Sequence, residues 1–229
     1  MIAITSRNLK VFFRDKSAVF FSLLAVFIII GLYALFLGDV WVNSLTEVHD
    51  ARFLMDSWIM AGLLAVTSVT TTMGAFGTMV DDRVKKISKD FYSSPVKKRS
   101  LAGGYILSSY IIGVIMSVVA LIIAELYIVM SGGEFLSPIA VLKVLGLILL
   151  STLTNSALVF FMVSFFKSLN AFSTASTIIG TLIGFLTGIY MPIGQLPSSV
   201  QIVVKVFPIS HAAALMRQII MEVPLKHSL

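Results

Sequence analysis

The sequence contains no cysteine, and this absence excludes several kinds of chemistry at once. Without thiols the chain has no disulfides, no thiol nucleophiles and no cysteine-ligated metals. The three histidines, His49, His211 and His227, are far apart and lack the spacing of metal ligands. We therefore expect no metal site in this chain.

Motifs for nucleotide binding and for covalent catalysis are also missing. No glycine-rich loop of the kind that cradles phosphates occurs in the sequence. No serine stands in a GxSxG setting or has an evident His–Asp pair. We expect neither a catalytic site nor a cofactor in this chain.

Charged residues are scarce, at 12% of the 229 residues, whereas 58% are hydrophobic and the mean hydropathy is +0.99. Soluble domains are about 25% charged and about 45–50% apolar. The excess predicts an all-α polytopic membrane protein that forms a single transmembrane domain over residues 1–229. The net charge of +6 comes from cations that cluster in particular loops, which the positive-inside rule explains better than a nucleic-acid partner does.

Five apolar runs are each close to or above the roughly 20 residues that a spanning helix needs. They cover approximately residues 17–37, 58–80, 101–130, 139–166 and 172–191. Cations precede the first run and follow the second and fourth. The other connectors carry Asp39, Glu47, Asp50, Asp56 and Glu134, with Arg52 as the one cation before Lys143. This alternation predicts a multi-pass protein of the plasma or inner membrane, with the N-terminus and the 81–100 loop in the cytoplasm.

The segment before the first span, residues 1–16, has the pattern of a helix that lies at the membrane surface. One side is apolar and carries Ile2, Leu9, Phe12 and Phe13. The other side is cationic and carries Arg7, Lys10 and Arg14, although Ile4 and Val11 also fall there. We predict an interfacial helix whose cations face anionic lipid. An ordinary basic flank before the span is the alternative.

The 81–100 loop is the one long, strongly charged segment of the chain. Its cations are Arg83, Lys85, Lys86, Lys89, Lys97, Lys98 and Arg99. Val84, Ile87 and Phe91 recur at spacings of three and four, with Tyr92 beside them, which predicts a short docking helix for a cytoplasmic partner. Asp81 and Asp82 fit neutralising partners of Arg83, Lys85 or Arg14 better than an acid–base pair, because no nucleophile or metal ligand lies near them.

Two spans carry small or hydroxyl residues on one face. Thr67, Thr71, Gly74 and Thr78 share a face of the second span, which allows close helix contact or lines a polar cavity. Ser176, Gly180, Gly184 and Gly188 are four apart in the fifth span and favour helix packing over a substrate surface. Glu125, inside the third span, is a candidate proton or cation site, unless it reaches the outer interface.

The residues after the fifth span predict a re-entrant segment over 192–222. Pro197 and Pro208 each stand near the start of a short amphipathic stretch. Lys205, His211 and Arg217 make these stretches too polar to span. We expect two short helices that lie at the outer face or dip into it.

Three stretches together carry a resemblance to a known family. They are the basic N-terminal helix, the loop SKDFYSSPVKKRSLAGGYIL and the segment MPIGQLPSSVQIVVKVFPISHAAALMRQII. In their order and spacing they resemble the membrane subunit of an ABC transporter of the ABC-2 type (type V exporter) family. The resemblance covers nearly the whole chain, although none of the three motifs is specific alone.

The resemblance implies six spans and a dimer, formed with an identical or a related permease subunit. It implies two ABC ATPase subunits on the cytoplasmic face, which would hold ATP and Mg²⁺. Val84, Ile87, Phe91 and Tyr92 would then belong to the coupling helix that docks into the ATPase. After Met221 only EVPLKHSL remains, so the expected sixth span is missing. An incomplete chain explains this better than a natural five-span design.

The function that these features favour is an export permease for a small or amphiphilic cargo, such as a drug, an antibiotic, a peptide or a lipid-linked molecule. Residues expected along the cargo path are Thr67, Thr71, Thr78, Ser176 and Thr177. One rival is a secondary transporter that uses Glu125 with Asp81 or Asp82 and an ion gradient. The other is a non-transporting membrane scaffold or immunity protein.

Overall fold

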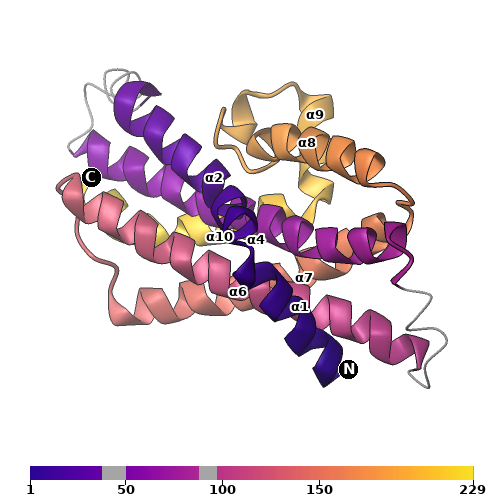
Figure 1. Cartoon of the computed structure of the whole chain (residues 1–229). Helices are drawn as coiled ribbons and strands as arrows, with labels where there is room; N and C mark the ends of the chain where they lie inside the picture. Colours follow the sequence, from indigo (N-terminus) through magenta and orange to yellow (C-terminus); the bar gives the residue numbers. More distant parts are fainter. Residues whose placement is uncertain (38–49, 88–96, 229) are drawn as a thin grey trace.

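The computed structural model describes residues 1–37, 50–87 and 97–228, and these residues form helices without any strand. The elements, in chain order, are α1 (Ile2–Arg14), α2 (Lys16–Leu32), the π-helix η1 (Tyr33–Leu37), α4 (Ala51–Val84), α6 (Lys98–Met130), α7 (Pro138–Ser164), α8 (Leu169–Leu186), the 3₁₀ turn η2 (Ile193–Gln195), α9 (Ser198–Val206), α10 (Pro208–Ile220) and α11 (Glu222–Ser228). The predicted all-α class is confirmed (Figure 1).

Five helices are long and apolar enough to cross a membrane, as the five apolar runs predicted. They are Lys16–Leu35, α4, α6, α7 and α8. The boundaries of the second span differ most, because α4 begins at Ala51 and not at residue 58. Because Asp56 is charged, the sequence predicts that it lies in the connector before the second span. In the structure it lies inside α4 and is only 1% exposed. Packing against neighbouring helices therefore extends this span beyond its apolar run.

Helix α4 is the centre of the bundle. It packs against α2, α6, α7, α8 and α10, and most of its residues are buried. Figure 1 shows α4, α6 and α7 running side by side along the length of the molecule. Gly113 of α6 lets these helices approach closely, because a Cβ atom there would lie 2.7 Å from the methyl groups of both Thr72 and Thr152.

The hydroxyl-rich face of α4 serves this close packing. Thr67 and Thr71 are fully buried, and each donates its hydroxyl to a carbonyl one turn back, at 2.8 Å to Leu63 O and 2.6 Å to Thr67 O. Asn155 of α7 donates its amide to Ser68 Oγ across the helix interface, at 2.7 Å. Of the two roles that the sequence left open for this face, the geometry favours helix contact for Thr67 and Thr71, whereas Gly74 has open space where a side chain would be.

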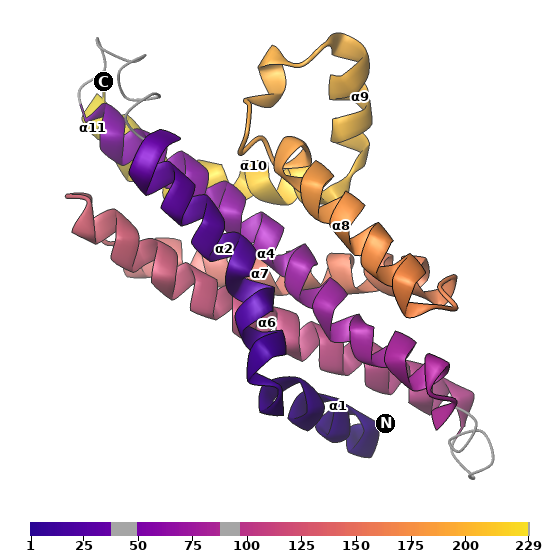
Figure 2. The same ribbon diagram turned by 45° about the horizontal axis from the view of Figure 1, so that its top comes forward.

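The chain after α8 folds back into the bundle. α9 and α10 meet at a 90° bend beside Phe207, and Pro208 occupies the first turn of α10, where its missing N–H costs nothing. Figure 2 shows α9 standing away from the bundle and α10 turning back into it, against α4 and α7. Ile209, Ala213, Met216 and Ile220 form the buried stripe of α10. This bent pair is the predicted pair of short helices.

Candidate functional site: a buried ion pair where α1 meets α4 and α6

Three elements converge where α4 ends at Val84 and α6 begins at Lys98, a region called here the α4–α6 end. Helix α1 lies against both helices at this end, and the N-terminus lies there too (Figure 1). The end of α11 lies at the opposite end of the bundle (Figure 1). The flanks of the 81–100 loop are therefore held by a third helix from the start of the chain.

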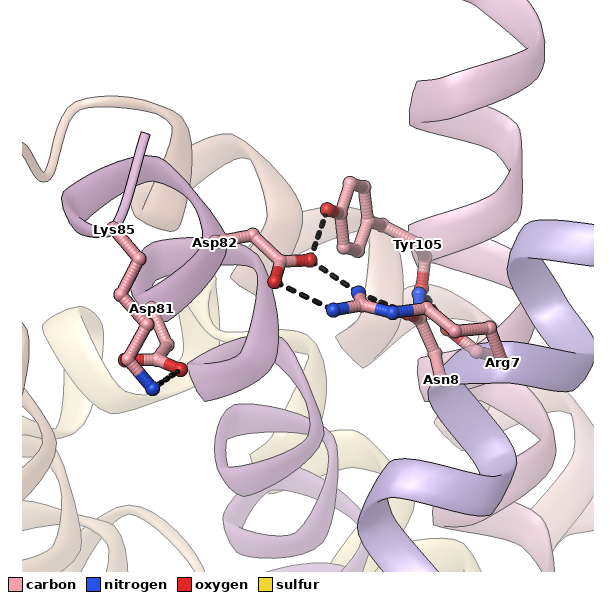
Figure 3. Close-up of polar contacts among 7 residues, drawn as sticks. Arg7, Asn8, Asp81, Asp82, Lys85 and Tyr105 are labelled. Atoms are coloured by element: carbon pink, nitrogen blue, oxygen red, sulfur yellow. Dashed lines mark hydrogen bonds and ion pairs between the residues drawn. The ribbon is translucent and has the colours of Figure 1, made fainter. Parts of the chain in front are cut away.

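A buried carboxylate joins these three helices. Asp82 of α4 is 2% exposed and accepts hydrogen bonds from both terminal nitrogens of Arg7 of α1. Arg7 Nη2 donates to Oδ1 at 2.8 Å, and Nη1 donates to Oδ2. The hydroxyl of Tyr105 of α6 donates to Oδ2 at 2.6 Å. Figure 3 shows Arg7 and Tyr105 pointing at the same carboxylate. We call Arg7, Asp82 and Tyr105 the Asp82 junction.

The Asp82 junction contains a bidentate ion pair between Arg7 and Asp82. Bidentate arginine–carboxylate pairs fix geometry as well as charge, because two parallel N–H donors meet two oxygens. The hydrogen bond to Asp82, assisted by its negative charge, raises the pKa of Arg7 above its ordinary value although partial burial opposes this. Arg7 therefore stays charged at any physiological pH.

Further contacts run along α1 and fasten it to α6. Asn8 donates its amide to Ser108 Oγ at 3.2 Å, and the hydroxyl of Thr5 lies 3.4 Å from Gly104 O. A Cβ atom on Gly104 would lie 2.7 Å from Ile4 Cγ2, so glycine is what allows α1 to lie this close. The contact between α1 and α6 is thus continuous over somewhat more than one turn of each helix.

The predicted two-sided pattern of α1 is wrong in one respect. Of its expected apolar side, only Phe12 is buried, whereas Ile4, which fell on the polar side, is buried as well. The protein-facing residues are Ile4, Thr5, Asn8 and Phe12. The helix has three faces and not two, because it meets the protein with one face while the remaining apolar and cationic residues point elsewhere.

The acidic residues at the end of α4 do neutralise cations, as expected, but the partner of Asp82 differs from the prediction. Asp81 pairs with Lys85 at 2.7 Å in an exposed i,i+4 contact. Asp82 pairs with Arg7, and not with Arg14 or Arg83. Arg83 instead donates to Ser164 O at 3.1 Å and to Phe166 O at 2.6 Å, where α7 ends.

The predicted docking residues lie at and beyond the end of α4. Val84 is the last residue of α4 and is 41% exposed, and Ile87 is half-buried. Lys86 has a φ of 61°, so the backbone turns away there and α4 does not continue. Phe91 and Tyr92 lie outside the described residues. Docking of a partner by these four residues stays a prediction.

The residues predicted for the cargo path are divided by the structure. Thr67 and Thr71 lie within the helix packing described above, and Thr78 is partly exposed. Ser176 and Gly180 of α8 line an open groove of about 460 Å³, bounded otherwise by residues of α1, α2 and α4. Thr177 is exposed on α8.

On the α4 side of this groove, sequence reasoning named Gly74 but missed Thr70. Thr70 and Gly74 of α4 line it, one turn apart. Thr70 precedes Thr71 in the sequence and points to a different side of the helix, so the hydroxyl run alone did not distinguish a packing face from a groove face.

The glycines of the fifth span have different roles. Gly180 has open space where a side chain would be. At Gly184 a Cβ atom would lie 2.2 Å from the ring of Tyr190, so the chain folds back onto this position. Gly188 has a φ of 68°, a backbone conformation that favours glycine, and lies in the turn after α8.

Glu125 is half-buried and its carboxylate accepts the backbone N–H of Leu136 at 3.0 Å. The contact fastens the segment that follows α6 to the end of that helix. This arrangement favours the interface alternative for Glu125 over an ion-coupling site.

A comparison with models of known protein families agrees with the resemblance that the sequence showed. The family model described as ABC-2 type transporter matches residues 1–221. No curated protein and no solved structure matches the chain. With a basic first helix joined to the flanks of a charged loop, five candidate spans and a bent helical pair after the fifth, this multi-pass membrane protein belongs to the ABC-2 type transporter family and is the permease part of an ABC transporter.

Proposed function

We propose that this chain is the membrane subunit of an ATP-driven exporter and couples a separate ATPase subunit to the efflux of a small or amphiphilic cargo. The observation that carries the proposal is the Asp82 junction. It ties together the helices on both sides of the 81–100 loop, so that a force on the loop would act on α1, α4 and α6 together. ATP and Mg²⁺ would belong to the ATPase, and no bond would be made or broken in this chain.

The central position of α4 supports the second step of this mechanism. Because α4 contacts α2, α6, α7, α8 and α10, a displacement of its end would alter every one of these interfaces. α8 is mostly exposed and has α4 as its main helical neighbour, so it would be the span that moves most easily. The groove between α2 and α8 would change in width as α8 moves.

The groove supports a location for the cargo path. We place Ser176 on this path, with Thr177 and Thr78 at its edges, in a dimer of two identical or related subunits. Thr67 and Thr71 would lie behind the path and support its wall. Serine and threonine hydroxyls beside apolar side chains suit a drug, an antibiotic, a peptide or a lipid-linked molecule, which are partly apolar themselves.

The orientation follows from the same proposal. The N-terminus and the α4–α6 end would face the cytoplasm of a cell whose plasma or inner membrane holds the protein, because the ATPase works there. The bent pair α9–α10 would then enter from the outer face.

The test is reconstitution with the ATPase subunit encoded nearest to this chain. We expect the two to co-purify and to drive cargo efflux only with hydrolysable ATP. The double substitution Ile87→Ala with Phe91→Ala should leave membrane insertion intact and either release the ATPase or uncouple hydrolysis from efflux. A matched control is Leu35→Ala with Leu142→Ala, two exposed apolar residues remote from the loop.

Undiminished ATPase capture and normal efflux in the Ile87/Phe91 variant would contradict the docking assignment. Efflux that survives ATP depletion but collapses with the proton gradient would instead indicate a secondary transporter. Protection of a host cell without any cargo movement would indicate a scaffold or immunity protein.

A further inference from the structure

A cavity of about 280 Å³, called here the α7–α8 cavity, lies apart from the groove between α2 and α8. Its walls are residues of α4, α7, α8 and the bend from Phe207 to Ile209. α7 and α8 follow each other in the chain but hardly contact one another, because each packs on α4 instead. Leu182 and Phe207 line the cavity and are 53% and 38% exposed, so they mark its mouth. Since α7 and α8 are both candidate spans, this mouth opens toward the bilayer.

The lining of the α7–α8 cavity is apolar except for Asn155 of α7, which is 4% exposed. Cavities with apolar walls stay dry, so an apolar chain suits this one better than water does. The amide of Asn155 donates to Ser68 Oγ at 2.7 Å, and the Ser68 hydroxyl itself donates to Ala65 O at 2.8 Å. The carbonyl oxygen of Asn155 accepts no hydrogen bond within the described part of the chain, and the fold does not seal it away. It is therefore left to accept a hydrogen bond from a ligand.

A second hollow of about 300 Å³, called here the α7–α10 hollow, adjoins the cavity. Asn155 and Pro208 line both spaces, so the two meet at these residues. The walls of the hollow include Ser151, Thr154 and His211. Along α7 the hollow covers positions up to Asn155, and the cavity covers positions from Asn155 onward. The joined space is thus apolar at one end and bears hydroxyl groups at the other, which is the polarity of an amphiphile.

The charges of the lining restrict the polar end of such a ligand. Among the described residues, neither lining contains a lysine, an arginine, an aspartate or a glutamate. An ionised headgroup would lose water here without gaining a counter-charge, and this costs far more than burial of a neutral group that keeps its hydrogen bonds. The ring of His211 already contacts Lys205 O through Nε2 at 2.7 Å. A neutral head with a hydroxyl donor therefore fits best.

We propose that the α7–α8 cavity and the α7–α10 hollow together bind one neutral, hydroxyl-bearing lipid of the bilayer, of the monoacylglycerol type. The acyl chain lies in the cavity, and a head hydroxyl donates to Asn155 Oδ1. The hollow lies nearer to the start of α7, which is the outer end in the orientation proposed above, so the head points outward as in an outer-leaflet lipid. This site does not require the exporter function, because the lipid enters from the bilayer.

Photolabelling of the full chain tests the proposal without any ATPase. The chain is reconstituted in phosphatidylcholine vesicles with a trace of a monoacylglycerol that carries a diazirine near the end of its acyl chain. After irradiation, the labelled residues are located by peptide mass spectrometry. We expect labels on the cavity walls, for example at Met162 and Ile183. Unlabelled monoacylglycerol should compete for the site, and its analogue with both hydroxyls methylated should compete about fivefold less well, since one neutral hydrogen bond is lost.

Substitutions in the chain give a second measure. Leu182→Trp adds bulk at the mouth of the cavity and should reduce labelling at Met162 several-fold. Leu153→Trp is the matched control, because Leu153 of α7 is 52% exposed and lines neither space, and it should leave labelling unchanged. Asn155→Leu should abolish the difference between the two competitors. The unfolding midpoint of each variant in detergent shows whether it is folded, and the comparison of competitors in the parent chain needs no variant.

Labels spread evenly over the exposed apolar side chains of the spans would overturn the proposal. So would undiminished labelling in Leu182→Trp, or equal competition by the hydroxyl and methylated compounds in the parent chain. Stronger competition by a fatty acid anion than by monoacylglycerol would contradict the neutral head and would likewise overturn it. Failure of ATP-driven efflux in a separate assay would bear on the exporter function alone.

Discussion

The guanidinium carbon of Arg217 lies 4.1 Å from the centre of the Trp58 ring, so a buried cation of α10 is stacked on an aromatic side chain of α4. Nε of Arg217 lies 3.4 Å from Trp58 O, and the indole N–H of Trp58 donates to Gly188 O at 3.3 Å. One tryptophan thus holds both the bent pair and the turn after α8 against the central helix.

We predict that Trp58→Leu destabilises the protein by about 2 kcal/mol or more, because a desolvated cation–π contact is worth roughly that much and Arg217 would keep no aromatic partner. Trp58→Phe retains a ring and should cost less. Thermal unfolding of the full chain in detergent measures both. Equal losses for the two variants would show that the stacking contributes little.

Gly62 makes the space that Arg217 occupies. A Cβ atom at Gly62 would lie 2.6 Å from Ile189 Cγ1 and 2.9 Å from Arg217 Nη2, so Gly62→Ala should cost about 1–3 kcal/mol through overpacking. Gly146→Ala in α7 is the matched control, since nothing lies within 4 Å of the point that its Cβ atom would occupy. The control should be neutral or slightly stabilising in the same unfolding assay, and a similar loss in both variants would contradict the crowding argument.

The two charged residues of the Asp82 junction, Arg7 and Asp82, should differ in how much stability their substitution costs. Arg7→Gln leaves a carboxylate unpaired at 2% exposure and should cost about 3–5 kcal/mol. Asp82→Asn leaves Arg7, whose side chain is 35% exposed and can reach water, so it should cost less. The double variant should lose less than the sum of the two, because neither charge is then left alone. Thermal unfolding of the three variants in detergent gives these losses.

The neighbouring pair Asp81–Lys85 is the control for this comparison. Its side chains are 33% and 62% exposed, and Lys85→Gln should change the free energy of unfolding by at most about 1 kcal/mol. A loss in Lys85→Gln equal to that in Arg7→Gln would show that burial does not set the strength of these pairs.

The glycines of α8 should separate folding from transport. Gly180 faces open space in the groove, so Gly180→Leu should preserve stability. The leucine side chain would occupy part of the groove volume and should therefore reduce cargo efflux. Gly184→Ala would meet the Tyr190 ring and should lower stability instead. Comparison of the unfolding midpoint with cargo efflux for the two variants checks this, and a Gly180→Leu variant with full efflux would remove the groove from the path.

The spans could be predicted from the sequence because hydrocarbon thickness sets a minimum length that apolar runs reveal directly. The start of α4 could not, since Asp56 reads as solvent-exposed in the sequence and only packing within the bundle buries it. The broken segment after α8 was predictable from Pro208 and the polar residues around it, because proline limits where a helix can begin.

The candidate site was only half visible in the sequence. The loop and its charge are local features, but Arg7 and Asp82 are 75 positions apart, and nothing in the local pattern selects Arg7 over Arg14 as the partner. Likewise, the periodicity of α1 shows an apolar side without showing which neighbours it meets. Pairings of this kind are set by the tertiary arrangement of α1, α4 and α6.

The length of α4 has a mechanical consequence. Its 34 residues rise about 51 Å, well beyond the roughly 30 Å of a bilayer's hydrocarbon layer, so the helix must tilt or project. Such a rod is a lever: a swing of about 5° around one tip displaces the other by roughly 4 Å. Asp82 lies near one tip and Trp58 about 36 Å from it along the helix, so such a swing about the first residue would shift the second by roughly 3 Å.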